Sequence, residues 1–404
     1  MKNIFKQLVS VLNKKKSKRT CSQNEDNSLL IDFLAKLFYI KSMTPNVQVW
    51  FDHTWHGGAE TYTFNNIKEL KDNTLIIRIQ NGGFDYFDIS YFYKDFENKI
   101  TLPSLNDVEA LINNLLPDTI VINNLASYRN ILGIIDFITK IKNEIKTTVS
   151  FRMHDFQCIC PTITLLNADN KCCCSETPPP PKLSICCECF KQLKKLYIRT
   201  DSIEIWQNKW SNFLQNIVDE IIVFSNSTKN ILKNFYPDIK ENKIKTIPHY
   251  VPPIRKVSIS KLENFNIGIL GIISVQKGAL ILEEIDKLLP EYPHLQIKII
   301  GSCDNNFNYI KTLGSYKLSE LPDIIEKEKI DIIFIPSVCP ETFSYTTSEA
   351  LNMGLPVACF NIGAPAERIQ DKKNGIIISK INAKSSLDEI TEFLNNYILN
   401  MEDK

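Results

Sequence analysis

Residues 336–369 read PSVCPETFSYTTSEALNMGLPVACFNIGAPAERI and follow directly on the apolar run DIIFI at 331–335. The pattern predicts a buried strand, a loop at 337–343, a helix from about Ser344 to Gly354, and a second strand in PVACF. Strand, helix and strand in this order form a βαβ unit, which places the region in the α/β class. Because the helix would begin right after a strand, its N–H groups and positive dipole end would offer a seat for phosphate near Phe343 and Ser344.

Two carboxylates lie in this stretch, Glu341 in the predicted loop and Glu349 in the predicted helix. We expect them at different depths of one pocket, where carboxylates beside hydroxyls commonly bind sugars. Taken alone, the two glutamates would be surface charges. The strand before them and the Gly-Leu-Pro-Val strand after them are what favour a site.

A second turn shows the same order of strand, turn and helix start. The run FNIGIL at 265–270 leads into Gly271, and Lys277 and Gly278 precede the helical pattern ALILEEIDKLL. This order predicts an ammonium group beside another helix N-terminus. A Lys-Gly pair is more often an ordinary helix start, but its place after the first strand of a new α/β half favours an anion site for a diphosphate.

Apolar runs alternate with helical patterns over most of the chain, which at 404 residues is too long for one ordinary hydrophobic core. The predicted strands are VQVWFD, TLIIRI, TIVINN, TTVSFRM and EIIVF in the first half, and FNIGIL, QIKII, DIIFIP, PVACF and GIIIS in the second. The alternation stops at 158–189, where the prolines at 178–181 exclude helix or central strand, and again at 249–262.

We therefore predict two facing Rossmann-like domains with ligands bound at the carboxyl ends of their strands. The predicted parts are a basic amphipathic extension at 1–44, an amino-terminal domain at 45–255 with a cysteine-rich insertion at 157–190, a carboxyl-terminal domain at 256–385, and a terminal helix at 386–404.

Composition narrows the class of protein. With 44% hydrophobic and 23% charged residues, the chain is neither disordered nor fibrous. Lys and Arg together number 47 against 46 Asp and Glu, and this balance argues against a protein that binds nucleic acid.

The first nineteen residues, MKNIFKQLVSVLNKKKSKR, carry seven basic side chains and no acidic one. Their apolar run is too short for a secretory signal, and the apolar stretch from Leu29 is interrupted by Asp32 and Lys36, so no spanning helix is expected. Apolar residues at helical spacing predict a basic amphipathic helix on an anionic membrane surface, and the alternative is a solvated, frayed terminus. We expect a cytoplasmic protein, peripheral on the inner face of the cytoplasmic membrane.

Eight of the twelve cysteines fall between positions 158 and 189. A reducing cytoplasm favours thiols or metal ligands over disulfides, and a C-x2-C pair with two further thiolates would make a structural zinc site. The alternative is a set of reduced, partly buried thiols. The candidate ligands are Cys186, Cys189, Cys160 and one of Cys172, Cys173 and Cys174, of which we take Cys174.

These motifs together resemble the retaining nucleotide-sugar glycosyltransferases of family 4, whose fold is the two-domain GT-B fold. The resemblance covers about 47–378 and is strongest in the carboxyl half. It rests on Glu341 and Glu349 spaced as glutamate-x7-glutamate, Gly354, Pro356, the turn at 363–367, the run Gly57-Gly58-Ala59-Glu60 after one strand, and His154 after another.

In the carboxyl half, the resemblance implies that Lys277, next to the Gly271 turn, contacts the donor diphosphate and that Glu349 contacts the ribose hydroxyls. Glu341, with the amides near Phe343 and Ser344, would hold the transferred sugar and the distal phosphate. These are the residues of the predicted donor-binding domain.

In the amino half, the resemblance implies that Gly57 and Gly58 close on the same diphosphate and that His154 bonds the sugar. Apart from the resemblance, His154 followed by Asp155 would more often be a core histidine satisfied by a neighbouring carboxylate. The catalytic candidates are thus His154, Glu341 and Lys277.

One departure from the family is visible. The family often has an arginine after the glycine that opens the lysine turn, but here Gly271 is followed by Ile272. The negative charge of the diphosphate would then be balanced by Lys277, by helix dipoles, and by Arg152 or Arg368.

The sequence thus predicts a hexosyltransferase that moves a sugar from a nucleotide-sugar donor to a lipid-linked or surface-polysaccharide acceptor, in polysaccharide biosynthesis of the cell envelope. No cofactor is expected for catalysis, since no Asp-x-Asp triplet occurs in a candidate loop, and zinc would be structural. Two alternatives stay open: a GT-B sugar-nucleotide epimerase, and a non-enzymatic zinc-knuckle protein that reads nucleic acid, which the near-zero net charge disfavours.

Overall fold

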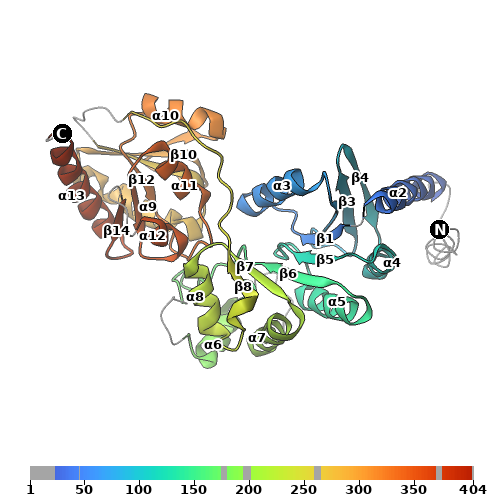
Figure 1. Cartoon of the computed structure of the whole chain (residues 1–404). Helices are drawn as coiled ribbons and strands as arrows, with labels where there is room; N and C mark the ends of the chain where they lie inside the picture. The colour runs from blue at the N-terminus through green and yellow to red at the C-terminus, as the bar shows by residue number, and fades with distance from the viewer. Residues whose placement is uncertain are drawn as a thin grey trace. The chain divides into compact units, whose positions relative to one another are not determined.

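The computed structural model describes residues 23–44, 46–173, 180–193, 202–258, 265–369 and 375–402 (Figure 1). The described residues form two compact units. The amino-terminal unit lies within Met1–Pro161, Lys194–Ile222 and Asp238–Lys245, and the carboxyl-terminal unit lies within Thr162–Leu193, Val223–Pro237 and Thr246–Lys404.

The amino-terminal unit is built on one eight-stranded sheet. Its strands are β1 (Val47–Asp52), β2 (Leu75–Gln80), β3 (Phe87–Tyr93), β4 (Phe96–Leu102), β5 (Thr119–Ile122), β6 (Thr148–Arg152), β7 (Glu220–Val223) and β8 (Ile244–Thr246), in the order β4-β3-β2-β1-β5-β6-β7-β8. The run from β2 to β7 through β1, β5 and β6 is parallel, and these are the five predicted strands. The antiparallel β3–β4 hairpin was not predicted, because most side chains of β4 are exposed or half-buried and give no apolar run.

Helices cover both faces of this sheet. On one face, α3 (Gly58–Leu70) packs Ile67 against Trp50 and Ile76. On the other, α5 (Ile131–Glu144) places Phe137 against Phe51, with ring centroids 6.1 Å apart. Two further helices of this unit are α4 (Leu105–Leu115) and α7 (Ile203–Asn212), the latter continuing into a π-helical turn, Phe213–Ile217.

Helix α2 (Gln23–Met43) is part of this unit, although the sequence assigned it to an extension. Phe33 and Leu37 are buried, and the Phe33 ring lies 5.2 Å from that of Tyr91 in β3. The predicted membrane-binding residues 1–19 lie outside the described residues. Within the described part of the chain, no helix is long and apolar enough to cross a membrane.

The carboxyl-terminal unit is built on a six-stranded parallel sheet. Its strands are β9 (Phe265–Ile273), β10 (Leu295–Cys303), β11 (Lys311–Gly314), β12 (Ile332–Ile335), β13 (Val357–Phe360) and β14 (Gly375–Ile378), in the order β11-β10-β9-β12-β13-β14. All five predicted strands are present, and the short, largely exposed β11 was not predicted. The prediction of two Rossmann-like sheets is confirmed.

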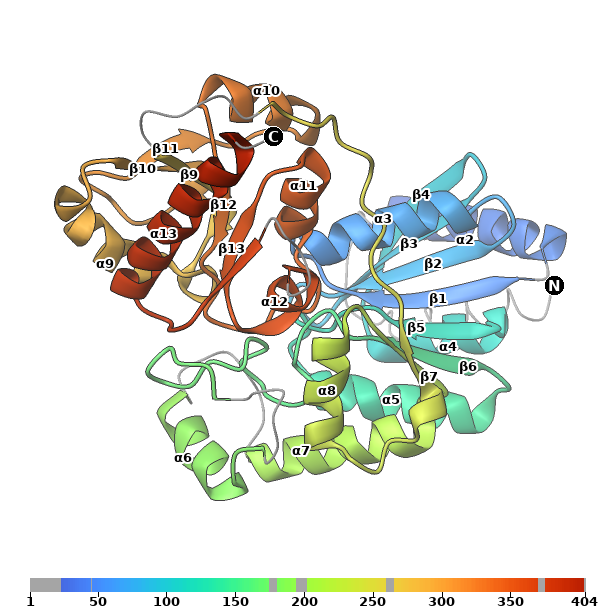
Figure 2. The same ribbon diagram turned by 60° about the vertical axis from the view of Figure 1, so that its left-hand side comes forward.

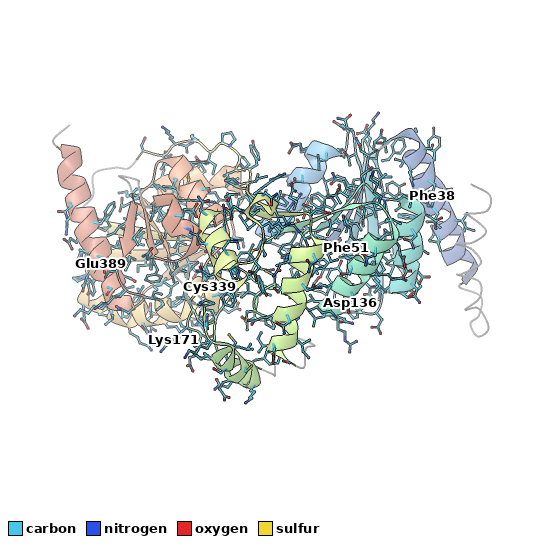
Figure 3. All side chains as sticks on the ribbon, turned by 60° about the horizontal axis from the view of Figure 1, so that its bottom comes forward. Phe38, Phe51, Asp136, Lys171, Cys339 and Glu389 are labelled. Atoms are coloured by element: carbon cyan, nitrogen blue, oxygen red, sulfur yellow. The ribbon has the colours of Figure 1, made fainter. Side chains whose placement is uncertain are left out.

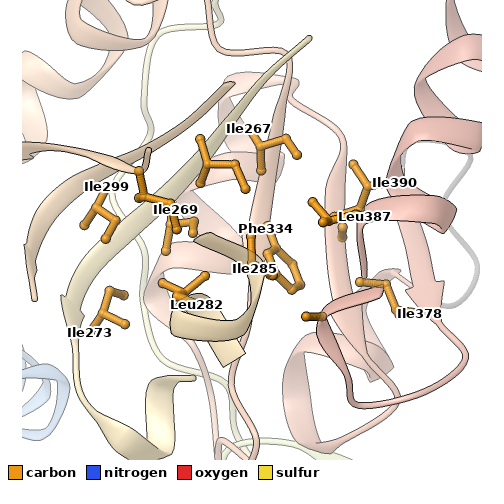
Figure 4. Packing of buried hydrophobic residues seen from close by; sticks show 14 of the residues in the cluster. Ile267, Ile269, Ile273, Leu282, Ile285, Ile299, Phe334, Ile378, Leu387 and Ile390 are labelled. Carbon is orange, nitrogen blue, oxygen red and sulfur yellow. The ribbon is translucent and has the colours of Figure 1, made fainter. Parts of the chain in front are cut away.

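Two hydrophobic layers sandwich this second sheet. On one face, α9 (Ala279–Leu288) and α13 (Ala383–Glu402) bury Leu282 and Leu387 against Ile269 and Phe334 (Figure 4). On the other face lie α10 (Leu321–Lys327), α11 (Tyr345–Met353) and α12 (Gly363–Ile369). The predicted helix between Ser344 and Gly354 is therefore confirmed as α11.

The cysteine-rich segment contains a helix, α6 (Leu183–Leu193), so the prediction of no helix across 158–189 was wrong (Figure 2). The helix begins only after the prolines, which explains how both can occur. Although the segment follows β6 in sequence, Thr162–Leu193 groups with the carboxyl-terminal unit. Leu166 is buried in the core of that unit, which also contains Cys339, and Cys172 packs against this core (Figure 3 labels Cys339 and Lys171, the residue before Cys172).

Candidate active site

In the carboxyl-terminal unit, the predicted site residues gather around Glu341, in the loop between β12 and α11. Its carboxylate lies 2.7 Å from Lys277 Nζ and accepts a hydrogen bond from Ser337 Oγ. The side chain is only 10% exposed, which would raise its pKa, but the Lys277 ammonium and the hydroxyls of Ser337 and Ser344 hold the pKa below its usual value. Glu341 is therefore an ionised carboxylate paired with a cation.

Three glycines allow the loops to approach this carboxylate. Gly278 has φ +92°, and a Cβ there would lie 2.2 Å from the carbonyl oxygen of Pro336. At Gly363, with φ +67°, a Cβ would lie 2.6 Å from the backbone nitrogen of Glu341. Gly271 has φ +101°, and its substituent would reach Thr346 in the first turn of α11. The end of β9, the Lys277 turn and the start of α11 thus lie together, as the sequence predicted.

The start of α11 is held by Arg368, from α12. Its Nη1 donates to the Ser344 carbonyl oxygen over 2.8 Å and also bonds the Ser348 hydroxyl. Its guanidinium lies 3.7 Å from the centroid of the Phe343 ring. Burial lowers the pKa of Arg368 to about 10, which still leaves it charged at neutral pH. A second cation therefore lies beside the N-terminus of α11.

His249 is a residue of this cluster that sequence reasoning missed. Its ring stacks on that of Phe343, with centroids 4.4 Å apart and planes inclined by 24°, and lies edge-on to Phe224 at 4.0 Å. Burial, with a smaller effect of Arg368, lowers the pKa of His249 to about 3, so the ring is neutral. The Phe343 side chain is therefore buried beneath His249 and Arg368.

Glu349 lies one turn further along α11. The hydroxyl of Tyr316 donates to its carboxylate over 3.4 Å, and burial raises the pKa of Glu349. This second carboxylate is therefore in a less polar setting than Glu341 and has no ion-pair partner among the described contacts.

Glu367, at the end of the predicted 363–367 turn, contacts a helix end instead of the cluster around Glu341. Its carboxylate accepts hydrogen bonds from the backbone nitrogens of Asn226 and Ser227, at 3.0 and 2.7 Å, and so caps α8 (Asn226–Phe235). A carboxylate at a helix N-terminus is stabilising, so Glu367 anchors α8.

In the amino-terminal unit, the predicted glycine loop forms the start of α3. Gly57 has φ +130°, which disfavours any side chain there, and its carbonyl oxygen accepts from the Thr61 nitrogen at 3.0 Å. Glu60, in the first turn, lies 2.8 Å from His56 Nδ1. Glu60 is thus a carboxylate in the first turn of a helix, where the helix dipole favours a negative charge.

His154, after β6, lies against the same helix. Its Nε2 is 3.0 Å from Asn123 Oδ1, and its ring meets that of Tyr62 edge-to-face with centroids 4.8 Å apart. The neighbouring Asp155 instead accepts from Asn124 Nδ2 and the Gln157 nitrogen, while burial raises its pKa to about 6. Asn123 was missed, although it follows β5 just as His154 follows β6, and polar residues at the carboxyl ends of neighbouring parallel strands lie at one edge.

Arg152, one candidate for the missing second cation, belongs to this unit. It lies 3.5 Å from the carboxylate of Glu220 and also bonds the Ser150 hydroxyl. Its charge is thus already paired.

The cysteines form no metal site among the described residues, which contain no group of three or more His, Cys, Asp or Glu side chains that could hold an ion. Cys160, Cys186 and Cys189 form no disulfide among the described residues, and Cys174 lies outside them. Cys186 and Cys189 are separated by one turn of α6 instead of a metal-binding knuckle.

Comparison with known proteins agrees with this architecture. Residues 254–403 match the family described as Glycosyl transferases group 1. HepE from Anabaena, solved in complex with UDP, has a similar structure, with a TM-score of 0.57 and 16% identity over 88% of this chain and 90% of that chain. Sucrose-phosphate synthase from Thermosynechococcus elongatus is similar at a TM-score of 0.57 and 12% identity, over 87% of this chain and 90% of that one.

Among curated proteins, sucrose synthase 6 of Oryza sativa subsp. japonica is 40% identical over 60 residues, a match that covers 15% of this chain and 7% of that protein. The architecture is the one these structures share, and the family match covers the unit that contains Lys277 and Glu341. The chain has the GT-B fold that its motifs predicted, and its residues 254–403 match the glycosyl transferases group 1 family.

Proposed function

We propose that the protein is a retaining glycosyltransferase that takes a hexose from a nucleoside diphosphate sugar. The observation that carries the proposal is the pair Lys277–Glu341 at 2.7 Å, beside the start of α11, within the region that matches the family. A cation and a helix N-terminus together suit a diphosphate, and an ionised carboxylate suits sugar hydroxyls.

Arg368 takes the role of the second cation in this proposal. The family arginine is replaced by Ile272, whose side chain is 78% exposed. Arg368 lies at the start of α11 and bonds the Ser344 carbonyl oxygen. Its charge adds to the positive potential at that helix end, although its contacts with Phe343 and Ser348 make it a fixed electrostatic contributor instead of a mobile ligand.

Each unit has its own task in the proposal. The carboxyl-terminal unit binds the donor, with Lys277, Gly271 and the amides near Phe343 and Ser344 at the diphosphate, and Glu349 at the ribose. The amino-terminal unit is the acceptor side. There Gly57 and Gly58 approach the phosphates and His154 bonds a sugar hydroxyl.

The reaction breaks the bond between the anomeric carbon and the phosphate oxygen, and the bonding electrons leave with the nucleoside diphosphate. Lys277 and the α11 N-terminus stabilise the charge that develops there. The acceptor hydroxyl attacks on the same face of the sugar, and its proton passes to the departing phosphate oxygen. No protein nucleophile and no metal is needed in this sequence of events.

The donor and acceptor are proposed by class. HepE binds UDP and UDP-glucose in its solved structures, so uridine donors are the first to try. For the acceptor we propose a lipid-linked or surface-polysaccharide glycan made at the cytoplasmic face of the membrane, reached through the basic residues 1–19.

The test is transfer from a panel of uridine, guanosine and adenosine diphosphate hexoses, with Glu341→Ala as the inactive control. We expect release of the nucleoside diphosphate, faster with an acceptor glycan, and a product that retains the anomeric configuration by NMR. Inversion, isomerised donor without transfer, or equal activity of Glu341→Ala would contradict the proposal.

A further inference from the structure

We propose that Phe84 and Tyr86, in the loop after β2, form an aromatic platform that binds a pyranose ring of the acceptor glycan. The role of that glycan as acceptor rests on the proposed function, and the platform is a subsite for it within the amino-terminal unit. Three features support this subsite. The two rings are exposed and parallel, their loop is fixed by hydrogen bonds, and a carboxylate lies between them in sequence.

The two rings of the platform stack on each other in solvent. Their centroids are 5.0 Å apart, and their planes are inclined by only 5°. Phe84 is 58% exposed and Tyr86 is 40% exposed. Single exposed apolar side chains are common on protein surfaces, but aromatic rings that gather at one place mark binding surfaces. The pair therefore indicates a ligand that has an apolar face.

The loop that carries the rings is fixed by Asn81, the residue after β2. Asn81 is buried, and its Nδ2 donates to the carbonyl oxygens of Phe84 and Tyr86 at 2.7 and 2.8 Å. Its Oδ1 accepts from the nitrogen of Gly83, whose φ of +88° suits glycine. Because the backbone at both rings is already held, little conformational entropy is lost when a ligand binds.

The same loop is held against the edge of the sheet. The Asn81 carbonyl oxygen accepts from Ser127 Oγ at 2.5 Å, and Ser127 Oγ accepts from the Thr54 nitrogen at 3.1 Å. These residues lie beyond the carboxyl ends of β2, β5 and β1, which are neighbouring parallel strands. Sheets of this class bind ligands at the carboxyl ends of their strands, so the platform belongs to the ligand-binding edge.

Asp85, between the two aromatic residues, favours a sugar as the occupant. Its side chain is 96% exposed, and its carboxylate lies 3.9 Å from Arg129 Nη1. A pyranose has C–H groups on its ring face and hydroxyls around its rim. Aromatic rings pack against the C–H groups, and a carboxylate oxygen accepts from a hydroxyl. A lipid surface is disfavoured, because the charge of Asp85 would have to leave water.

The direct test is saturation-transfer difference NMR of the full chain without any donor. The probes are trisaccharides to hexasaccharides of glucose, galactose, mannose and N-acetylglucosamine. We expect at least one probe to receive saturation on its ring C–H protons in wild type. Phe84→Ala and Tyr86→Ala should each bind that probe about tenfold more weakly, because one ring contact is lost. No binding of any probe to wild type, or wild-type affinity in both variants, would overturn the proposal.

Phe96→Ala is the matched control. Phe96 is 53% exposed and belongs to the same sheet, but it pairs with Tyr93 at the far end of the β3–β4 hairpin. Its loss should leave glycan binding unchanged, whereas Phe84→Tyr keeps an aromatic ring and should retain the wild-type affinity. If Phe96→Ala weakened binding as much as Phe84→Ala, the contact would be nonspecific and the subsite would be wrong.

Asp85→Ala tests the hydroxyl contact and leaves both rings in place. The position is exposed, so the variant should fold even if a ring variant does not. We expect it to bind the probe about threefold more weakly, because one hydrogen-bond acceptor is removed. Unchanged affinity would contradict a sugar as the occupant.

A second copy of the chain is the rival occupant of the platform. Sedimentation of wild type and Phe84→Ala at several concentrations detects it. If wild type associates, Phe84→Ala does not, and no probe binds, the platform is a subunit interface and the proposal is overturned.

Kinetics separate this subsite from the proposed function. With an active donor and acceptor, Phe84→Ala should raise the acceptor KM about tenfold and leave the donor KM unchanged. If a probe binds as described but no nucleotide sugar is turned over, the proposed function fails and the glycan subsite stands. If transfer occurs and Phe84→Ala keeps the acceptor KM of wild type, only the subsite fails.

Discussion

The clusters of candidate residues in the two units differ in charge. In the carboxyl-terminal unit the cluster is charged and compact, with Lys277, Glu341 and Arg368 brought together by glycine turns within one region of sequence. In the amino-terminal unit the carboxylate of Asp52 pairs with Arg78 in the core, and the hydrogen bonds run from Asp52 to the neutral amide of Asn123 and on to His154. The two cations of the first cluster suit an anion, and the second cluster offers no such unpaired positive charge in the contacts given above.

The largest effect is expected from Glu341→Ala. The substitution removes the carboxylate that pairs with Lys277 and, in the proposal, contacts the transferred sugar, so transfer should fall about 1,000-fold, or about 4 kcal/mol. Steady-state kinetics with the best donor measure it. Glu328→Ala, which removes a glutamate that pairs with Lys298 in the same unit, is the control. An equal loss in both variants would mean that the site is elsewhere.

Close approach of the loops can be tested at two glycines that have the same φ. Gly278 and Gly314 both have φ +92°, but a Cβ at Gly278 would lie 2.2 Å from the Pro336 oxygen, whereas nothing lies within 4 Å of one at Gly314. Gly314→Ala should cost about 1 kcal/mol for the left-handed conformation alone. Gly278→Ala should cost about 3 kcal/mol or more, because the loop must also move.

Urea unfolding of both variants measures the difference in the free energy of unfolding. Similar losses of unfolding free energy in the two variants would mean that the turn at Lys277 is not tightly packed against Pro336, which follows β12. The cluster of Lys277, Glu341 and Arg368 would then be less ordered than described.

The charged cluster was largely predictable from the sequence, and the neutral one was not. The strand, loop and helix around Glu341 are contiguous and were predicted from local pattern. Lys277 lies in a distant turn with the same strand-to-helix pattern, and the family resemblance linked it to Glu341. Asn123 and Asp52 come from strands that the sequence separates by 71 residues, and their contact depends on which strands are neighbours in the sheet. Strand order is not encoded in any local motif.

Lys277→Met is expected to have an intermediate effect. The apolar stem is kept while the charge is lost, so the affinity for a nucleoside diphosphate should fall about tenfold, and the difference should shrink at high salt. Calorimetric titration at low and high salt measures it. In the amino-terminal unit, Lys71→Met removes a lysine that bonds the Lys94 carbonyl oxygen and should leave the affinity unchanged. An equal loss there would point to a nonspecific charge effect.

The smallest effect concerns His249. Its pKa is lowered to about 3 in the folded chain, from an ordinary value of 6.5, so the unfolded state binds a proton first as the pH falls. Its contribution to stability is therefore complete above about pH 6.5 and is lost below it, by up to about 1.4 kcal/mol per pH unit. His249→Phe keeps an aromatic ring against Phe343 and should flatten the decline between pH 6.5 and 4.5.

Unfolding free energies at several pH values test this, with His294→Phe, a partly exposed position in the same unit, as control. A decline as steep in His249→Phe as in wild type would mean that His249 is not buried as a neutral ring.

The most direct measurement is the thermal stability of wild type and Lys277→Met with nucleosides, nucleoside diphosphates and diphosphate sugars. A ligand that binds only the folded state raises its melting temperature. We expect at least one nucleoside diphosphate to raise that of wild type by about 3 °C or more, its nucleoside to have no effect, and Lys277→Met to lose most of the shift. No shift with any diphosphate, or an equal shift in Lys277→Met, would contradict a diphosphate site at Lys277 and Glu341.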